Sequence, residues 1–497
     1  MAVETRFLDD DIIRIPVFAP DNAGKPTGEK LKTFTLMWGD QVRVTGKQDD
    51  RLVVEFSPRE WDEENQRYEV VKYAGLLPKK AKFRDASVLK VRFVDVGQGD
   101  GAMVETPQGR ILFIDGGEEE HLRRYVNVAY SHLLRTKPLH CDALIVTHGD
   151  ADHFEGLTRL VRAFRSKEDP MITADRVFHN GLVKKKKEEG TPETVMFGKT
   201  ATVDGQTYAV ELEDDLTKVG DQRMNEPFLA WKQALLGLKT GDGTRPKIQR
   251  LEYGDDKPFD FLASENIQVK VLGPITETVK GKPALRFLRK PGSSSLSASH
   301  TVNGHSIVLK LIYGNVRFLF GADLNEESEE SLLERARADQ VSLSAEILKV
   351  PHHGSSDFSP RILEAIRPVV SVVSSGDENT MKEYIHPRSG LLGALGRFSR
   401  ATVDKPLIFV TEMVAFFRRL PGRNKIIALT KAGKDGKQVY RGPNAYVKSA
   451  FGIVHVRTDG KRVLVATHSG KETDKESYVF HVDERGDIQF EAEPRIV

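Results

Sequence analysis

The first part of the chain alternates short apolar and polar runs and predicts β-structure. Runs such as Thr33–Met37 and Gln41–Thr45 place apolar residues at every second position, and turn signals lie at Gly39–Asp40 and Asp49–Asp50. Alternation with this period is typical of strands that bury one face. We therefore predict a small β-rich module in residues 1–85.

From residue 86 onward, strands alternate with amphipathic helices, which indicates an α/β domain over residues 86–400. Apolar residues recur at helical spacing over Glu119–Leu134 and again over Glu155–Phe164, and an acidic helix is predicted from Glu326. Turn residues between apolar runs indicate two hairpins. The predicted strands are Val88–Val96, Ala102–Glu105, Ile111–Ile114, Ala143–Val146, Ser306–Tyr313, Val316–Phe320, Ile347–Val350 and Pro368–Val373.

Two segments differ from this pattern. Residues 166–265 show few sustained apolar periods, and we predict an insertion that covers the rim of the site. Its lysine tract, Lys184–Lys187, is typical of a solvated loop, with a nucleic-acid contact as the alternative. After residue 401 the apolar runs are short, as in Pro406–Val410 and Ile453–Val465, and predict a separate β-rich module at 401–497.

Composition and charge exclude several classes of protein. The 497 residues carry 74 Lys and Arg against 72 Asp and Glu, so the formal charge of +2 does not by itself indicate a polyanion partner. Cys141 is the single cysteine, which excludes an intrachain disulfide framework and thiolate metal clusters. Because the chain shows no leader-like start and no long apolar run, we expect a soluble, cytoplasmic protein without membrane contact.

The most informative segment is the loop after the apolar run Ala143–Val146. It places His148, Asp150, Asp152 and His153 together, and without a cation these groups would repel one another or be desolvated. A pair of metal ions fits better than one, because neighbouring Asp152 and His153 project differently from His148 and Asp150. The alternative is a solvated polar loop in which Asp152 caps a helix.

Further candidates stand where other predicted strands end. Asp95 and Asp115 follow two strands in the first half of the domain. Asp323 follows the second hairpin, and either His352 or His353 follows Ile347–Val350. His305 is a further possible ligand, with a polar strand residue as the alternative interpretation.

These motifs resemble known families. The order Asp115-Gly116-Gly117, His148–His153, Gly321-Ala322-Asp323 and His352–Ser355 resembles the metallo-β-lactamase superfamily. Within it, the motifs that resemble the cytoplasmic hydrolase domain of bacterial DNA-uptake competence channel proteins are Asp95–Asp100, His352–Ser355, Ser374–Gly376 with Asn379, and Tyr384–Pro387. The resemblance covers roughly Val88–Phe398, apart from the insertion.

The resemblance implies a four-layer αββα sandwich with two divalent ions, Zn²⁺ or Mn²⁺, at one edge of the sheets. The implied roles are first-ion ligands His148 and Asp150, second-ion ligands Asp152, His153 and His352, a bridging Asp323, and outer-shell carboxylates Asp95 and Asp115. Asp150 stands where the superfamily more commonly has His, and such a carboxylate accommodates Mn²⁺ readily. Between the adjacent histidines we favour His352 as the ligand, with His353 facing the substrate.

The implied chemistry is attack by a metal-bridging hydroxide, with Asp152 and Asp323 holding the reacting centre. Candidates that bind or protonate the leaving group are His353, His386, Lys349 and Asn379. The alternatives are that Lys349 only extends its charge to solvent, that Asn379 forms an Asx turn and that His386 packs.

Three functions remain after this step. A phosphodiesterase or nuclease acting on nucleic acid or a nucleotide is favoured, and hydrolysis of a non-nucleic ester, lactone or amide is the alternative. In the third, the protein is a metal-binding scaffold or regulator that recruits protein partners through its terminal modules. The clustered His and Asp residues argue against this third hypothesis, because a scaffold has no reason to keep them at the free-energy cost of their desolvation. The channel proteins have membrane helices and this chain shows none, so it resembles stand-alone hydrolases instead.

Overall fold

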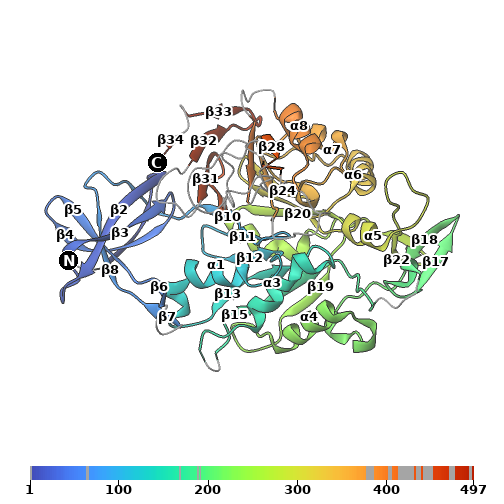
Figure 1. Cartoon of the computed structure of the whole chain (residues 1–497), viewed down its shortest axis with the longest axis horizontal. Helices are drawn as coiled ribbons and strands as arrows, with labels where there is room; N and C mark the ends of the chain where they lie inside the picture. Colours follow the sequence, from blue (N-terminus) through green and yellow to red (C-terminus); the bar gives the residue numbers. More distant parts are fainter. Residues whose placement is uncertain are drawn as a thin grey trace.

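A computed structural model describes most of the chain, and a central α/β body carries a β-sheet at each end (Figure 1). The blue N-terminal sheet lies at one end, and the small sheet with β17, β18 and β22 lies at the other. The described residues are 3–62, 67–166, 169–186, 190, 192–376, 386–400, 406–411, 430–432, 438–439, 452–468, 476–491 and 495–496.

The N-terminal part forms a seven-stranded sheet of its own, in the order β3-β2-β8-β5-β4-β1-β9. Its strands are β1 (Glu4–Leu8), β2 (Ile12–Pro20), β3 (Pro26–Met37), β4 (Gln41–Gln48), β5 (Arg51–Phe56), β8 (Tyr73–Leu77) and β9 (Phe83–Arg84), with β6 (Arg59–Asp62) and β7 (Arg67–Val70) paired separately. Alternate residues such as Ile15 and Val54 form its core. The sheet is tied to the body by Arg457, whose Nη1 donates to the Trp38 carbonyl oxygen at 2.6 Å.

The first sheet of the central body has eleven strands, in the order β19-β16-β14-β12-β11-β10-β30-β31-β32-β33, with β34 beside β32. Strands β12, β14, β16 and β19 run parallel, so their carboxyl ends share one edge. The bounds are β10 (Leu89–Phe93), β11 (Ala102–Glu105), β12 (Ile111–Ile114), β14 (Ala143–Ile145), β16 (Arg176–His179), β19 (Lys247–Arg250), β30 (Ile453–Thr458), β31 (Arg462–His468), β32 (Glu476–Val482), β33 (Ile488–Phe490) and β34 (Arg495–Ile496).

The second sheet has six strands, in the order β20-β23-β24-β25-β26-β27. Strands β24 to β27 run parallel, which gives this sheet a common carboxyl edge as well. The bounds are β20 (Ile267–Gly273), β23 (Val308–Tyr313), β24 (Val316–Phe320), β25 (Ile347–Lys349), β26 (Val370–Val373) and β27 (Leu407–Val410).

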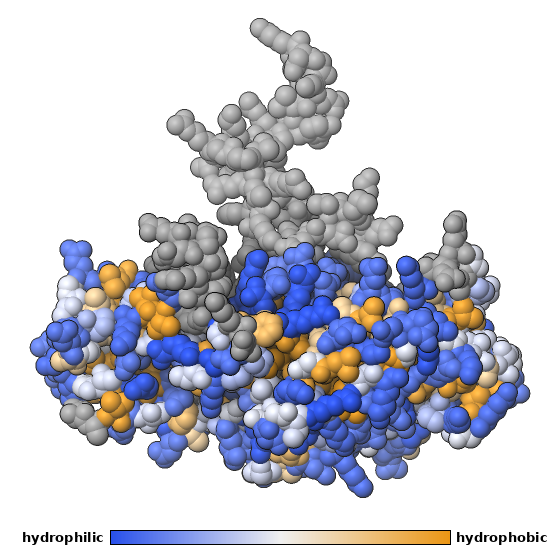
Figure 2. Space-filling view, turned by 90° about the horizontal axis from the view of Figure 1, so that it is seen from below, coloured by the Kyte–Doolittle hydropathy of each residue, from blue (hydrophilic) through white to orange (hydrophobic). Residues whose placement is uncertain are grey.

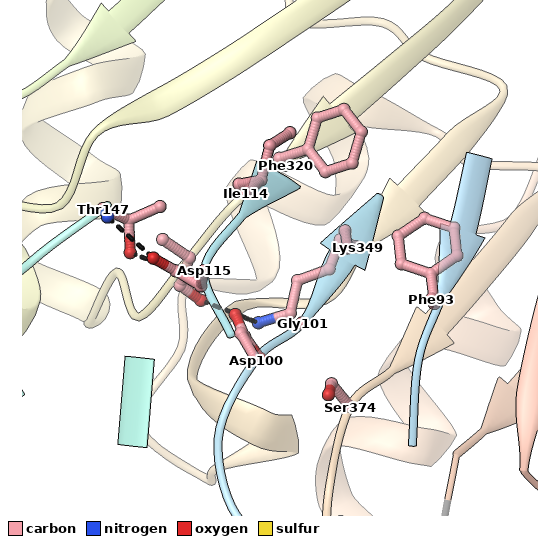
Figure 3. Close-up of a pocket in the computed structure, with 11 residues that line it drawn as sticks. Phe93, Asp100, Gly101, Ile114, Asp115, Thr147, Phe320, Lys349 and Ser374 are labelled. Carbon is pink, nitrogen blue, oxygen red and sulfur yellow. Dashed lines mark hydrogen bonds and ion pairs between the residues drawn. The ribbon is translucent and has the colours of Figure 1, made fainter. Parts of the chain in front are cut away.

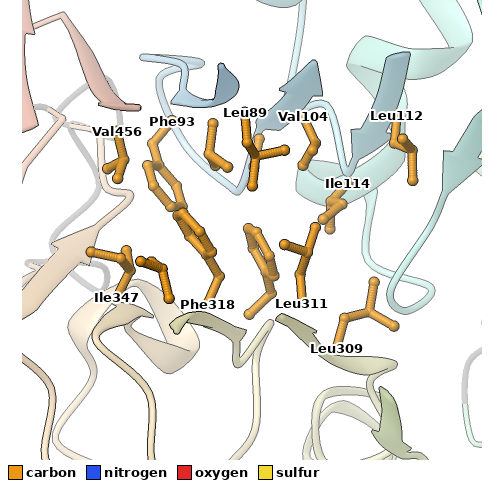
Figure 4. Close-up of a cluster of buried hydrophobic side chains, with 14 of the residues drawn as sticks. Leu89, Phe93, Val104, Leu112, Ile114, Leu309, Leu311, Phe318, Ile347 and Val456 are labelled. Carbon is orange, nitrogen blue, oxygen red and sulfur yellow. The ribbon is translucent and has the colours of Figure 1, made fainter. Parts of the chain in front are cut away.

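Apolar side chains of the two sheets meet in one buried core, as Figure 4 shows for Phe93 and Phe318. In β10, Leu89, Val91 and Phe93 join this core, because a strand sends alternate side chains to opposite faces. The other faces pack against helices through separate buried clusters, which contain Leu122 and Leu157 for the first sheet and Leu332 and Leu391 for the second. The predicted α/β class is confirmed.

The helices on the first sheet begin and end close to the sequence expectation. The helix predicted at Glu119–Leu134 is divided at Tyr130 into α1 and α2, and the next helix already begins inside the metal loop. The bounds are α1 (His121–Ala129), α2 (Ser131–Leu134), α3 (Ala151–Arg162), α4 (Glu226–Gly237), α5 (Ala298–Gly304), α6 (Glu326–Ala338), α7 (Pro360–Ile366) and α8 (Ser389–Phe398).

Residues 166–265 are more than an insertion over the rim, which corrects the sequence expectation. β16 and β19 extend the first sheet, and α4 packs Phe228 and Trp231 against Phe154 of α3. Two smaller sheets complete this half, namely β13 (Leu139–Cys141) with β15 (Ile172–Ala174), and β17 (Thr200–Val203), β18 (Gln206–Ala209), β22 (Lys282–Arg286) and β21 (Glu277–Val279).

The C-terminal strands do not form the separate module expected at 401–497. β27 continues the second sheet beside β26, and β30 pairs along the whole of β10 in the first. Val456 and Phe480 belong to the core between the two sheets. A further pair, β28 (Thr430–Ala432) with β29 (Gln438–Val439), is also described in this part.

Within the described ranges, no helix combines the length and apolar character needed to cross a bilayer. The face in Figure 2 is mainly hydrophilic, with apolar residues scattered over it in small groups.

Candidate metal centre

Loops from both sheets converge at their carboxyl edges. β12 is followed by Asp115, and β14 is followed by Thr147 and the segment that enters α3. In the second sheet β24 leads to Asp323, and β25 leads to a short 3-10 turn, Pro351–Gly354. Parallel strands end at one edge, so residues far apart in the sequence become neighbours there.

Four buried residues bring a ligand atom each into one compact group. The ligand atoms of Asp100, His153, Asp323 and His353 all lie within 4.8 Å of one another. His353 Nε2 is 3.1 Å and His153 Nε2 is 3.4 Å from Asp323 Oδ2. His353 Nδ1 is 3.2 Å from Asp100 Oδ1. Imidazole and carboxylate are the donor types that Zn²⁺ and Mn²⁺ take.

The group contains polar atoms that the rest of the described chain does not satisfy. In this group His153 Nε2, His353 Nε2 and Asp323 Oδ1 are buried and, among the described residues, have no hydrogen-bond partner, and the same is true of His148 Nε2 beside the group. Buried polar atoms are normally paired, and several unpaired atoms that face one another require an explanation. A divalent cation would satisfy the three atoms of the group together, so the residues present fit a metal ion.

The acid–base properties of the group lead to the same interpretation. Burial opposes charge on His353, but Asp323 and Asp100 raise the pKa of its imidazole to about 10. Burial likewise opposes charge on His153, yet Asp323 and Asp115 hold its pKa well above the usual value. Without a metal the carboxylates therefore retain protons on the imidazoles. A bound cation would displace these protons.

Asp115 holds His153 in place. Its Oδ2 lies 2.8 Å from His153 Nδ1 and accepts from the Thr147 hydroxyl at 2.6 Å, while its Oδ1 accepts from the Thr147 backbone N–H at 2.8 Å. Figure 3 shows the contact between Asp115 and Thr147. A carboxylate on one ring nitrogen orients the other toward a metal and raises its basicity.

Lys349 supports Asp100 from behind. Its ammonium contacts Asp100 and donates to the Ala322 carbonyl oxygen at 3.1 Å, and both charged side chains are buried (Figure 3). The cavity of about 10 Å³ beside them suits a single water molecule and is too small for a substrate. This position makes Lys349 a support for Asp100, where the sequence suggested contact with a leaving group.

Asp150 and His148 form the neighbouring half of the site. His148 Nε2 lies 3.9 Å from both Asp150 Oδ2 and Asp323 Oδ2. Burial, with His153 adding to it, lowers the pKa of His148 to about 3, so this imidazole is neutral. Asp150 Oδ1 contacts the ammonium of Lys184.

Asp152 lies at the edge of the compact group. Its Oδ2 is 3.6 Å from His353 Nε2 and accepts a long contact of 3.5 Å from Gln98 Nε2. Gly99 packs directly on this residue: with φ at +99°, it would place a Cβ 1.7 Å from the Asp152 carbonyl oxygen. Only glycine permits this approach of the Asp95–Asp100 loop to the metal loop.

The two adjacent histidines lie in the opposite arrangement to the one we expected. His352 lies outside the compact group, with its Nε2 3.3 Å from the side-chain amide of Asn303, while His353 lies inside it. Both have φ near +50°, and this tight turn separates the two rings to 6.3 Å between centroids. Strand order alone does not indicate which of two consecutive side chains faces inward after such a turn.

Three other candidates lie away from the group. His305 follows the end of α5, and its Nε2 is 2.7 Å from the Arg286 carbonyl oxygen, so it does not reach the centre. Asp95 accepts from the Gly97 backbone N–H at 3.3 Å, inside its own loop. His386 lies beside His352 with ring centroids 6.2 Å apart, and burial together with His353 lowers its pKa to about 4. Asn379 lies outside the described residues.

Sequence reasoning assigned no role to Asp100 or Lys184. Asp100 ends the glycine-rich segment Asp95–Asp100, which we quoted only as part of a resemblance. Lys184 follows β16, which runs parallel to β14. That arrangement could have placed Lys184 beside Asp150, but without strand pairing the lysine tract resembled an ordinary solvated loop.

A fold of two packed sheets with a His and Asp centre at their carboxyl edge defines a class of metal-dependent protein. Residues 94–229 match the family model described as the metallo-beta-lactamase superfamily. The chain therefore contains a domain of this superfamily, which is generally hydrolytic.

One curated relative shares part of the chain. This relative is the competence protein ComA of Neisseria gonorrhoeae, to which the chain is 36% identical over 86 residues. These residues make up 17% of this chain and 12% of that protein. The chain thus spans a small part of that relative's length.

Proposed function

We propose that the protein is a metal-dependent phosphodiesterase or nuclease that hydrolyses nucleic acid or a nucleotide. The observation that carries the proposal is the buried group of Asp100, His153, Asp323 and His353, whose facing atoms lack partners within the described part of the chain. The partial match to a competence protein and the sequence resemblance to hydrolase domains of DNA-uptake proteins support a nucleic-acid substrate. We also propose that the layers described above form the αββα sandwich of the superfamily.

Each residue of the centre has a defined task in this proposal. Asp100, His153, Asp323 and His353 would hold a divalent ion, either Zn²⁺ or Mn²⁺. When bound, such an ion lowers the pKa of water and stabilises negative charge on a phosphoryl oxygen. Asp115 orients His153, and Lys349 keeps Asp100 in position. Burial excludes bulk water and strengthens every charge interaction in the centre.

Residues beside the group would contact the substrate. The His386 imidazole is neutral at pH 7, so it suits a hydrogen bond to a phosphoryl oxygen better than proton donation. His352 lies beside it and outside the ligand group. We assign these two histidines to substrate contact in place of His353.

The test is hydrolysis by metal-stripped protein reconstituted with Zn²⁺ or Mn²⁺. Substrates are labelled single- and double-stranded DNA, RNA and bis(p-nitrophenyl) phosphate. Asp323→Asn removes the central carboxylate at constant size, and Asp260→Asn is a matched change at an exposed position. We expect cleavage of a polymer by wild type and by Asp260→Asn, and its loss in Asp323→Asn.

The other outcomes distinguish the remaining functions. Cleavage of the small diester alone would restrict the substrate to nucleotides or other small phosphodiesters. Hydrolysis of p-nitrophenyl acetate or a lactone without any phosphodiester cleavage would overturn the proposal in favour of an esterase. A metal-loaded protein without activity on any of them would favour the scaffold interpretation.

A further inference from the structure

Lys184 is placed at the metal centre by its backbone. It follows β16, whose neighbour β14 delivers the metal loop to the same edge of the sheet. Its carbonyl oxygen accepts from the Asn225 N–H at 2.9 Å, and the next residue, Lys185, donates its N–H to Met196 O at 2.9 Å. The backbone around Lys184 is therefore held on both sides, and its partly buried side chain reaches Asp150.

Asp150 is already satisfied by the chain itself. Lys184 contacts its Oδ1. With the Asn303 amide oriented so that its nitrogen meets acceptors and its oxygen meets the His352 nitrogen, Asn303 Nδ2 donates to Asp150 Oδ2 at 2.9 Å. Both oxygens of this carboxylate thus have donors. Asp323 Oδ1 has no hydrogen-bond partner among the described residues.

The two halves of the centre therefore differ in their need for a cation. The half built from Asp100, His153, Asp323 and His353 has facing atoms that only an added ion would satisfy. In the half built from His148 and Asp150, His148 Nε2 also lacks a hydrogen-bond partner among the described residues, but an ammonium already neutralises the carboxylate. A divalent ion placed there would find Asp150 already engaged with other donors, and the nearby ammonium would repel it.

We propose that Lys184 is a built-in cation of the centre, which holds one divalent ion tightly and admits a second at His148 and Asp150 only weakly. The inference rests on the proposed metal centre and narrows it from the two ions that the sequence resemblance implied to one tightly bound ion. In this arrangement the Lys184 side chain sets the number of bound ions. If a second ion replaced Lys184 as the partner of Asp150, the ammonium would be released from this contact.

The number of ions tests this directly. The metal-stripped protein is dialysed against fixed free Mn²⁺ concentrations, bound manganese is counted by mass spectrometry, and the loaded protein is examined by electron paramagnetic resonance. We expect one ion and a six-line mononuclear spectrum for wild type. For Lys184→Met we expect two ions, a coupled multiline spectrum and at least tenfold tighter binding of the second ion.

Matched variants separate charge from other effects. Lys184→Arg keeps the positive charge and should keep one ion, and Lys186→Met, an exposed change on the same loop, should do the same. Lys184→Met combined with Asp150→Asn should return to one ion, because the second site then lacks its carboxylate. If Lys184→Met does not fold by circular dichroism, Lys184→Gln carries the same expectation.

Two tightly bound ions of similar affinity in wild type would overturn the inference, and so would an unchanged ion count on loss of the Lys184 charge. Failure of the proposed function is a separate result. A protein with one tight ion that cleaves no substrate would contradict the phosphodiesterase proposal and leave the role of Lys184 intact. A protein that binds no Mn²⁺ or Zn²⁺ would contradict both.

Discussion

Two buried groups of charged side chains depend on the first sheet, and they balance their charge in different ways. On its helix-covered face, Glu105 accepts from Lys90 and Arg92 at 2.8 Å each and from the Tyr130 hydroxyl at 2.6 Å. At its carboxyl edge, the metal centre leaves Asp323 Oδ1 and three imidazole nitrogens without hydrogen-bond partners in the described chain.

The difference separates a structural cluster from a functional one. Burial opposes ionisation of Glu105, but Arg92 and Lys90 hold the pKa of its carboxyl well below the usual range. The chain supplies every counter-charge there, so the Glu105 cluster is complete after folding. The candidate metal centre would be complete only when an ion from outside joins it. An incomplete buried cluster is therefore an indication of a ligand.

The largest effect on stability should come from breaking the complete cluster. Glu105→Ala leaves two buried cations without a partner and should lower the free energy of unfolding by about 3–5 kcal/mol. Urea denaturation followed by circular dichroism measures it, and the exposed Glu364→Ala is the control. A change below about 1 kcal/mol would show that the cluster contributes little.

Metal should stabilise the incomplete cluster and leave the complete one unaffected. At a free Mn²⁺ or Zn²⁺ concentration about 100 times the dissociation constant, stability should rise by about 2.7 kcal/mol. Calorimetry with the ion or with a chelator measures the change in Tm. Glu105→Gln should keep this shift, and Asp323→Asn should lose it. Equal Tm values for metal-free and metal-loaded wild type would contradict a site that gains its counter-charge from the ion.

Asp115→Asn should weaken metal binding without abolishing it. The variant removes the charge that orients His153, and loss of such a partner lowers metal affinity about 10- to 100-fold. Titration calorimetry with Mn²⁺ gives the dissociation constant, with Asp260→Asn as the control. Unchanged affinity would mean that Thr147 and the surrounding packing position His153 on their own.

The pH dependence of stability should differ between the two clusters, and this difference should be the smallest of the predicted effects. A carboxyl whose folded pKa is lowered stabilises the fold above its unfolded pKa, near 4.5 for Glu105, and loses that contribution as the pH falls through its folded value. The difference in unfolding free energy between wild type and Glu105→Gln should therefore shrink from about pH 6 to about pH 3. Urea midpoints over this range measure it, and a constant difference would argue against ionised Glu105 in the fold.

Local sequence signals predicted much of the centre. The hairpin of β11 and β12 pairs as expected, since two apolar runs flank a turn that holds Gly109. The metal loop follows the strand that we expected to precede it, and His153 lies in the compact group. Asp323, predicted at the end of the second hairpin, lies there as well. Such signals work because turn chemistry and period-two alternation act over a few neighbouring residues.

Other features followed no local rule. β30 pairs with β10 although most of the chain separates them, and no periodicity in either strand indicates its partner. The same limit hid the continuation of the second sheet by β27. Short β-runs near the end of the chain resemble a small separate module until their pairing is known.

The sequence by itself determined that two imidazoles and two carboxylates crowd one loop after a buried strand, and this crowding predicted a metal site there. Only the tertiary structure decided which distant residues complete the site. The turn at His352 and His353 directs the second imidazole inward, the Gly99 contact brings Asp100 close, and parallel pairing of β14 with β16 sets Lys184 against Asp150. Composition and spacing record which groups are available, whereas their direction in space depends on backbone angles and strand pairing set by the whole fold.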